Sequence, residues 1–197
     1  MKNLKKIALT ALAAVTTTVA PAQAGQVIDG YHIMDEADFA TSKPHVRIVQ
    51  ALTALGIPVF DGGKNGFKQC EPRENGTYTL GFYNPKHNAM VLCTNNGDEA
   101  TMKETLTHEA VHVLQDMRAG LDNVNLKTYE TDINSFAKTL PERHVDLIVK
   151  LYPREQWAEE IEARALQTNP VMVGEILAKS ARKRAIRAGK PVPTFVF

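Results

Sequence analysis

The stretch Thr107-His108-Glu109-Ala110-Val111-His112 places two histidines four positions apart, with a glutamate directly after the first. On a helix, residues i and i+4 lie on one face about 5–6 Å apart at Cβ, so both imidazoles could ligate one metal ion. Glu109 would project beside that ion and could accept a proton from water that the ion acidifies. The stretch therefore predicts two metal ligands, His108 and His112, and a general base, Glu109.

The residues around this stretch favour one long helix from about residue 99 to residue 119. Apolar side chains recur at helical spacing on both sides of the histidines. Gly97-Asp98 is a plausible start signal and Gly120 a plausible stop signal. The two histidines are therefore expected on one face of an amphipathic helix, although two ordinary surface histidines would give the same pattern.

A catalytic zinc ion needs a third protein ligand and one open position for water. The metzincin spacing would require glycine at 115 and histidine at 118, but the chain has Gln115 and Arg118 there. The third ligand must therefore come from another segment. A second helix is predicted over residues 157–166, between Tyr152-Pro153 and Asn169-Pro170, and it carries three glutamates.

The two histidines, followed after several dozen residues by Glu160-Ile-Glu162-Ala163, resemble the gluzincin branch of the zincin metallopeptidases. This resemblance implies that Glu160 is the third ligand, that Zn²⁺ is the cofactor and that the substrate is a peptide or protein. It also implies a small zincin-like α+β fold, mainly helical, with a short β-hairpin or sheet beside the histidine helix. Several such families have an aspartate after the alanine as support for a ligand histidine, whereas this chain has Arg164, which leaves that contact unassigned.

Helical phase gives a separate reason to prefer Glu160 among the acidic residues. Glu160 lies near the edge of the apolar stripe predicted from Leu151, Ala158, Ile161 and Ala165, with Leu166 as a further candidate. A carboxylate near a buried face needs a cation or hydrogen-bond donors. The alternatives, in order, are Glu162, Glu159 and Asp116, the last of which follows His112 by four residues. A solvated acidic face, with Arg164 paired to Glu160, would also fit the pattern.

Two further features bear on substrate binding. Residues 76–83 and 89–93 are β-prone and are separated by a five-residue turn, which predicts a hairpin with an exposed His87. By the same resemblance, an extended peptide is expected to pair with the free edge of this hairpin. The hydrogen-bond donor for the oxyanion of a tetrahedral intermediate is left open between Gln115, Tyr129, His144 and Tyr152.

Residues 1–24 show the three parts of a secretory signal peptide, with Lys2, Lys5 and Lys6 before an apolar run that ends in Ala22-Gln23-Ala24. We therefore expect export to the periplasm or outside the cell, and a single domain over residues 25–197. No later segment approaches the length of a membrane span. Removal of the signal would leave 20 basic and 22 acidic side chains, a balance that gives no indication of nucleic-acid binding.

The only two cysteines, Cys70 and Cys93, both lie in the exported part of the chain. An oxidising compartment favours a disulfide between them, although two separate buried thiols would also fit. They are not expected to bind the metal ion.

Outside these motifs, the pattern predicts a helix over 44–55, a strand over 57–60, two short helices within 129–150 and a helix over 171–188. The basic end of that last helix is interpreted as a solvated face, and the tail 189–197 is expected to dock in an extended form. Two other functions remain open at this point. One is an exported, catalytically inactive zincin-like module that binds metal or protein, and the other is a metallohydrolase that acts on cell-wall amides.

Overall fold

The computed structural model describes residues 26–28, 30–74, 76–120, 126–128 and 133–196. They form a mixed α+β domain, which confirms the predicted fold class. The predicted signal peptide, residues 1–24, and Tyr129 lie outside the described residues. None of the helices in the described ranges combines the length and apolarity that a bilayer crossing needs.

A five-stranded sheet has the order β1-β2-β3-β5-β4, so that β4 is an edge strand. The β3–β5 pair is parallel, and all the other pairs are antiparallel. The hairpin of β4 and β5 confirms the prediction, although β4 begins at residue 81 and not at residue 76. Residues 77–79 do not extend this strand: Thr77 O accepts from Arg73 N, and Thr79 O accepts from the Asn96 side-chain amide. The strands are β1 Gln26–Ile28, β2 Tyr31–Ile33, β3 Val59–Asp61, β4 Gly81–Asn84 and β5 Ala89–Leu92.

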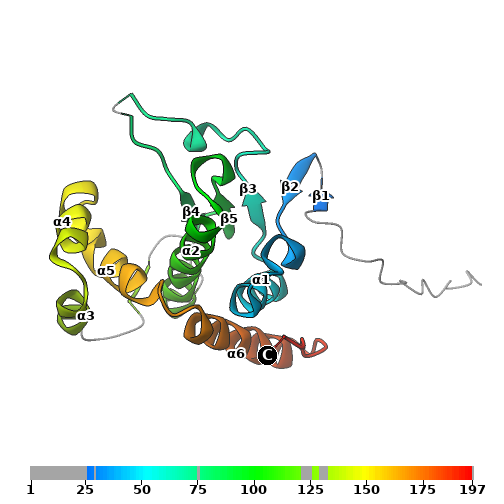
Figure 1. Ribbon diagram of the computed structural model, residues 1–197. Helices are drawn as coiled ribbons and strands as arrows, with labels where there is room; N and C mark the ends of the chain where they lie inside the picture. Colours follow the sequence, from blue (N-terminus) through cyan, green and yellow to red (C-terminus); the bar gives the residue numbers. More distant parts are fainter. Residues whose placement is uncertain (1–25, 29, 75, 121–125, 129–132, 197) are drawn as a thin grey trace, which may run out of the picture.

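Helix α2, Glu99–Ala119, is the central element of the domain and has the predicted bounds (Figure 1). Asp98 caps its N-terminus by accepting a hydrogen bond from Thr101 N. Gly120 ends it with φ +107°, a left-handed conformation that favours glycine. Helix α2 is therefore held at both ends by the signals seen in the sequence.

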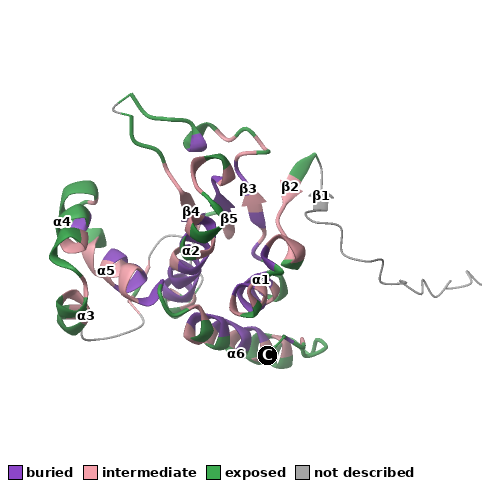
Figure 2. Cartoon of the chain, in the orientation of Figure 1, coloured by how far each residue is buried: buried purple, intermediate pink, exposed green. Residues whose placement is uncertain are grey.

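The main core lies where α2, α1 (Lys43–Leu55) and α6 (Pro170–Arg187) meet one face of the sheet. Helices α1 and α6 pack along each other (Figure 1). The fully buried side chains that fill this core include Phe39, Ile48, Leu52, Met90, Leu92, Leu106, Val111 and Leu177. Figure 2 shows the buried stripe along α2 and α1.

Three helices form an arm on the other side of α2: α3 (Ile133–Thr139), α4 (Glu142–Leu151) and α5 (Trp157–Leu166). Short 3-10 helices cover Glu36–Phe39, Lys68–Cys70, Thr94–Asn96 and Arg154–Gln156. Helix α4 is mostly exposed, and α5 lies between it and α2 (Figures 1 and 2). This arrangement confirms the two predicted spacer helices and returns the acidic α5 to the histidine helix.

The tail docks against α1, as predicted. Arg47 Nε donates to Val196 O at 2.8 Å, and Val196 N donates to Gln50 Oε1 at 3.0 Å. Phe195 is buried and lies under the Arg182 guanidinium, 5.2 Å from the ring centroid. One residue of the predicted basic face is therefore used in packing, while Lys183 and Arg187 are exposed.

Candidate metal centre

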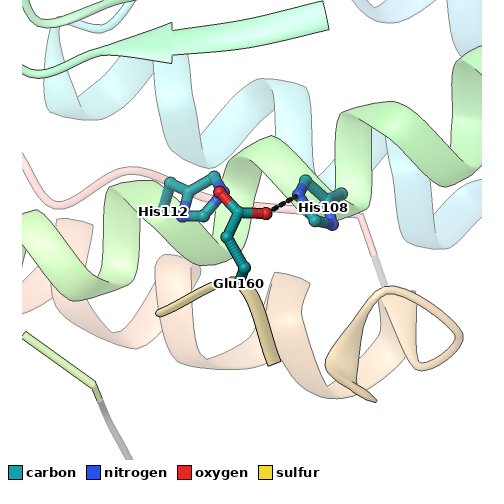
Figure 3. Close-up of side chains that lie close together, drawn as sticks. All are labelled: His108, His112 and Glu160. Carbon is teal, nitrogen blue, oxygen red and sulfur yellow. Dashed lines mark ion pairs between the residues drawn. The ribbon is translucent and has the colours of Figure 1, made fainter. Parts of the chain in front are cut away.

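His108 and His112 on α2 and Glu160 on α5 come together into one group that could hold a metal ion (Figure 3). Each offers one ligand atom, and these atoms lie within 4.8 Å of one another. Glu160 Oε2 is 3.4 Å from His108 Nε2, and Glu160 Oε1 is 3.5 Å from His112 Nε2. Two ligands about 2.0–2.1 Å from a tetrahedral ion are about 3.4 Å apart, so the spacing fits such an ion.

The two imidazoles stand nearly perpendicular, with ring centroids 4.9 Å apart and an interplanar angle of 84°. Hydrogen bonds hold the side of each ring that faces away from Glu160. His112 Nδ1 is 2.7 Å from Gln115 Oε1, and His108 Nδ1 is 3.0 Å from Gln167 Oε1. Each ring therefore directs Nε2 toward the metal position.

Glu109 is buried beside this group and accepts a 2.9 Å hydrogen bond from the backbone N–H of Tyr83 on β4. Burial raises the pKa of the Glu109 carboxyl to about 7. The charge of His112 and the Tyr83 amide oppose this rise, whereas the Glu160 carboxylate adds to it. A carboxyl group with a pKa near neutrality is suited to both accept and release a proton.

The other three acidic candidates lie outside the group. Glu162 is fully buried and accepts a hydrogen bond from Gln115 Nε2 at 2.8 Å. Asp116 is fully buried and accepts from the Tyr83 hydroxyl at 2.6 Å. Glu159 is partly buried, which raises the pKa of its carboxyl, but its side chain does not join the histidines. Among these acidic residues, the structure brings only Glu160 to both rings.

The predicted apolar stripe of α5 is wrong except at Leu166, which is the one member of it that is buried. Leu151 lies on α4 and is 61% exposed. The buried face of α5 instead runs through Glu160, Glu162, Ala163 and Leu166. The buried carboxylates are satisfied by polar side chains of α2, so this face has few of the apolar residues by which a periodicity search finds a core.

Tyr152, one of the four oxyanion-donor candidates, lies at the centre. Burial, together with the nearby charges of Glu160 and Glu109, raises the pKa of its hydroxyl well above its usual range. The Gln115 amide is instead used by His112 and by α5. His144 lies half-buried on α4, and Tyr129 is outside the described residues.

Sequence reasoning missed Gln167 and the role of Gln115. Gln167 follows Glu160 by seven residues, which is close to two helical turns, so its position on the same face of the helix was a usable signal. Gln115 follows His112 by three residues and is likewise its neighbour on a helix. Because the sequence does not identify the residue that each glutamine contacts, neither glutamine differs from an ordinary surface residue.

Cys70 and Cys93 form a disulfide, with their Cα atoms 5.2 Å apart. Together with Val91 they make a small second core on the face of the sheet opposite the metal centre, against Phe60, Phe67 and Phe82. As predicted, neither cysteine belongs to the metal group. His87 in the hairpin turn is exposed, also as predicted.

Residues 34–131 match the model of the Peptidase M76 family. The matched region runs from the segment before α1 through β4 and β5 to the end of α2, so it contains both histidines and Glu109 but stops before Glu160. No curated protein and no solved structure matches the chain. The chain is therefore similar to the Peptidase M76 family in the region that carries His108, Glu109 and His112, and this similarity supports a metallopeptidase.

Proposed function

We propose that this chain is an exported zinc-dependent metallopeptidase of the gluzincin type, with His108, His112 and Glu160 as zinc ligands. The observation that carries the proposal is the meeting of these three side chains at 3.4 and 3.5 Å. Two imidazoles and one carboxylate are the ligand set of many hydrolytic zinc sites. Three protein ligands leave a fourth position for water or substrate, which a catalytic site requires.

When bound, Zn²⁺ supplies Lewis-acid chemistry: it lowers the pKa of water and polarises the scissile carbonyl. Glu109 is the general base in this proposal. Its buried carboxylate takes the proton from the attacking water, and the resulting acid gives that proton to the departing amine. The raised pKa of Glu109 supports this double use, because the group is neither a strong acid nor a strong base near neutral pH.

Tyr152 is the best-placed donor for the developing oxyanion. Its hydroxyl lies close enough to the Glu160 carboxylate for the carboxylate charge to raise the pKa of the hydroxyl. The raised pKa of this hydroxyl keeps its proton in place over the neutral range, so it can donate a hydrogen bond to negative charge that forms beside Glu160.

The edge strand β4 is the proposed binding site for the substrate backbone. In an antiparallel pair, alternate residues direct their N–H and C=O groups away from the partner strand. Tyr83 does so, since its N–H meets Glu109. A peptide paired with this edge would therefore pass close to the proposed base. Peptide substrates should be cleaved in preference to small esters, and an equal preference would count against strand pairing.

Export is proposed from residues 1–24 and from the cysteine pair. A charged start, an apolar run and a small-residue cleavage site are the marks of a signal peptide. A disulfide between Cys70 and Cys93 is typical of proteins that fold in an oxidising compartment. Both features favour a protein that acts in the periplasm or outside the cell.

The proposal is tested by metal analysis of the purified chain together with a chelator-sensitive peptide or casein assay. Glu109→Gln should retain zinc and lose roughly 10²- to 10⁴-fold in hydrolysis, the range that a general base contributes. Glu99→Gln, on the exposed start of the same helix, is the matched control and should keep full activity. A fully active Glu109→Gln enzyme would falsify the role of the base, and a wild-type chain that binds zinc without any hydrolysis would favour a binding module.

A further inference from the structure

Seven polar side chains of α2 and α5 form one continuous chain of contacts through the metal centre. All but one of these contacts join the two helices: the His112–Gln115 contact lies within α2, Gln167 is the C-cap of α5, and Glu104 lies one turn before His108 on α2. Glu104 accepts a hydrogen bond from Gln167 Nε2 at one end, and Glu162 accepts one from Gln115 Nε2 at the other. In order, the members are Glu104, Gln167, His108, Glu160, His112, Gln115 and Glu162.

The orientation of each glutamine amide is dictated by its carboxylate partner. Gln115 Nε2 has two acceptors, Glu162 Oε2 at 2.8 Å and the backbone carbonyl of Glu159 at 2.9 Å. A carboxylate and a carbonyl cannot donate, so the NH₂ group must face them. The amide oxygen is then left for His112. The same argument applies to Gln167, whose NH₂ group faces the Glu104 carboxylate while its oxygen faces His108.

This orientation fixes the hydrogen position on both imidazoles. An amide oxygen can only accept, so Nδ1 of His108 and Nδ1 of His112 must each carry the hydrogen. In the neutral ring, Nε2 then holds the lone pair, and Nε2 is the atom that faces Glu160 in both histidines. Gln115 and Gln167 are 0% and 4% exposed, so water has little access to replace either amide oxygen.

We infer that Gln115 and Gln167 are positioning residues that present both imidazoles to the metal ion in the ligating tautomer. This inference rests on the proposed zinc centre. It also explains the burial of Glu162 at 0% exposure, because a buried carboxylate needs donors and Gln115 supplies one. The two outer carboxylates orient the amides without placing a further negative charge against the histidines.

A purely structural role for the two glutamines predicts a different effect of their removal. If they only tie α5 to α2, their removal lowers the melting temperature and leaves the zinc affinity of the folded protein unchanged. If they position the histidines, zinc affinity and the geometry at the metal change as well. The test therefore measures the zinc dissociation constant by chelator competition, the visible absorption of the Co²⁺-substituted protein, and the melting temperature.

Gln115→Leu and Gln167→Leu should each weaken zinc binding by roughly 10- to 100-fold, the usual effect of removing a partner of a ligand histidine. Each should also alter the Co²⁺ absorption. Asn65→Leu is the matched control. The Asn65 amide lies in a loop and pairs with the backbone of His32 on β2, and neither residue belongs to the metal group. That control should lower the melting temperature without changing zinc affinity.

If the leucine variants do not fold, an exchange of Gln115 and Glu162 keeps the test decisive. Gln115→Glu alone places two carboxylates in contact and should weaken zinc binding. Adding Glu162→Gln restores a donor and an acceptor between these two positions, with the new carboxylate accepting from His112 Nδ1, so zinc affinity should rise above that of Gln115→Glu alone. A folded double variant that binds no better than Gln115→Glu overturns the inference.

The wild-type measurement separates the two proposals. A wild-type chain that binds neither Zn²⁺ nor Co²⁺ overturns the metal centre and this inference together. Wild-type binding, with folded leucine variants of equal affinity and unchanged Co²⁺ absorption, overturns the positioning role alone and leaves the zinc centre standing.

Discussion

Tyr83 holds Glu109 in place: its backbone N–H donates a 2.9 Å hydrogen bond to Glu109 Oε2 from the edge strand β4. The hydroxyl of the same tyrosine donates to Asp116 at 2.6 Å, two turns further along α2. One residue thus fastens the edge strand to the metal helix at two points. Glycine at 81 permits this close approach, since a Cβ there would lie 2.6 Å from Thr105 Cγ2 and 2.9 Å from Val91 O.

Tyr83→Phe should lower the free energy of unfolding by about 1–3 kcal/mol, because it removes the hydroxyl donor from the fully buried Asp116. Zinc affinity should stay unchanged, since Asp116 is not in the metal group. Urea denaturation and chelator competition measure the two effects. Tyr78→Phe, at a 54% exposed position, is the control, and an equal loss of stability in both variants would contradict the importance of the bond.

Glu160→Ala should sharply reduce zinc occupancy in the purified protein, as measured by elemental analysis, because it removes one of the three proposed ligands. Glu159→Ala is the matched control. It removes the neighbouring carboxyl but keeps the backbone carbonyl that binds Gln115, so its occupancy should equal that of the wild type. Full occupancy in Glu160→Ala would move the assignment to Glu162, Glu159 or Asp116.

Replacing both cysteines by alanine should lower the free energy of unfolding by about 3 kcal/mol, the value that the chain-entropy model gives for a loop of this length. The disulfide closes the segment that contains β4 and β5, so the loss falls on the strands beside the metal helix. Denaturation of the wild type with and without a reductant gives an independent measure. Equal stability of the oxidised wild type and the double variant is the contrary result.

Asp98→Ala should lower the melting temperature at neutral pH and have a smaller effect in acid. Hydrogen bonds from the Thr101 side chain and backbone lower the pKa of the Asp98 carboxyl in the folded state. A lowered folded pKa means that the stabilising effect is present above the unfolded pKa and is lost as the pH falls through the folded value. Melting curves at pH 7 and near pH 2 measure the difference, and a constant gap between variant and wild type would refute the capping role.

The two helices of the centre could be predicted from the sequence because local signals determine their ends. Asp98 and Gly120 cap α2, and Tyr152-Pro153 and Asn169-Pro170 bracket α5. Glu160 was preferred by helical phase and resemblance, and the structure places it between the two histidines. These features depend on neighbours within a few residues, which is the range over which sequence patterns act.

The polar partners of the histidines could not be predicted in the same way. Gln167 meets His108 from 59 residues away, and Gln115 meets Glu162 across 47 residues. A buried polar residue looks like a surface residue in a hydropathy pattern, so the pattern assigns the buried face of α5 to its apolar positions, whereas the structure buries Glu162. The position of β4 at the edge of the sheet likewise depends on pairings between distant strands.

Helix α5 and its C-cap residue bring Glu160, Glu162 and Gln167, whereas α2 brings both histidines from far earlier in the polypeptide. During synthesis, an unfinished product that stops short of residue 157 would possess both histidines and Glu109 but would lack Glu160 and the Gln167 partner of His108. The proposed peptidase activity would thus arise only when nearly the whole chain has been made. The cell would then contain no partly synthesised chain that is already active.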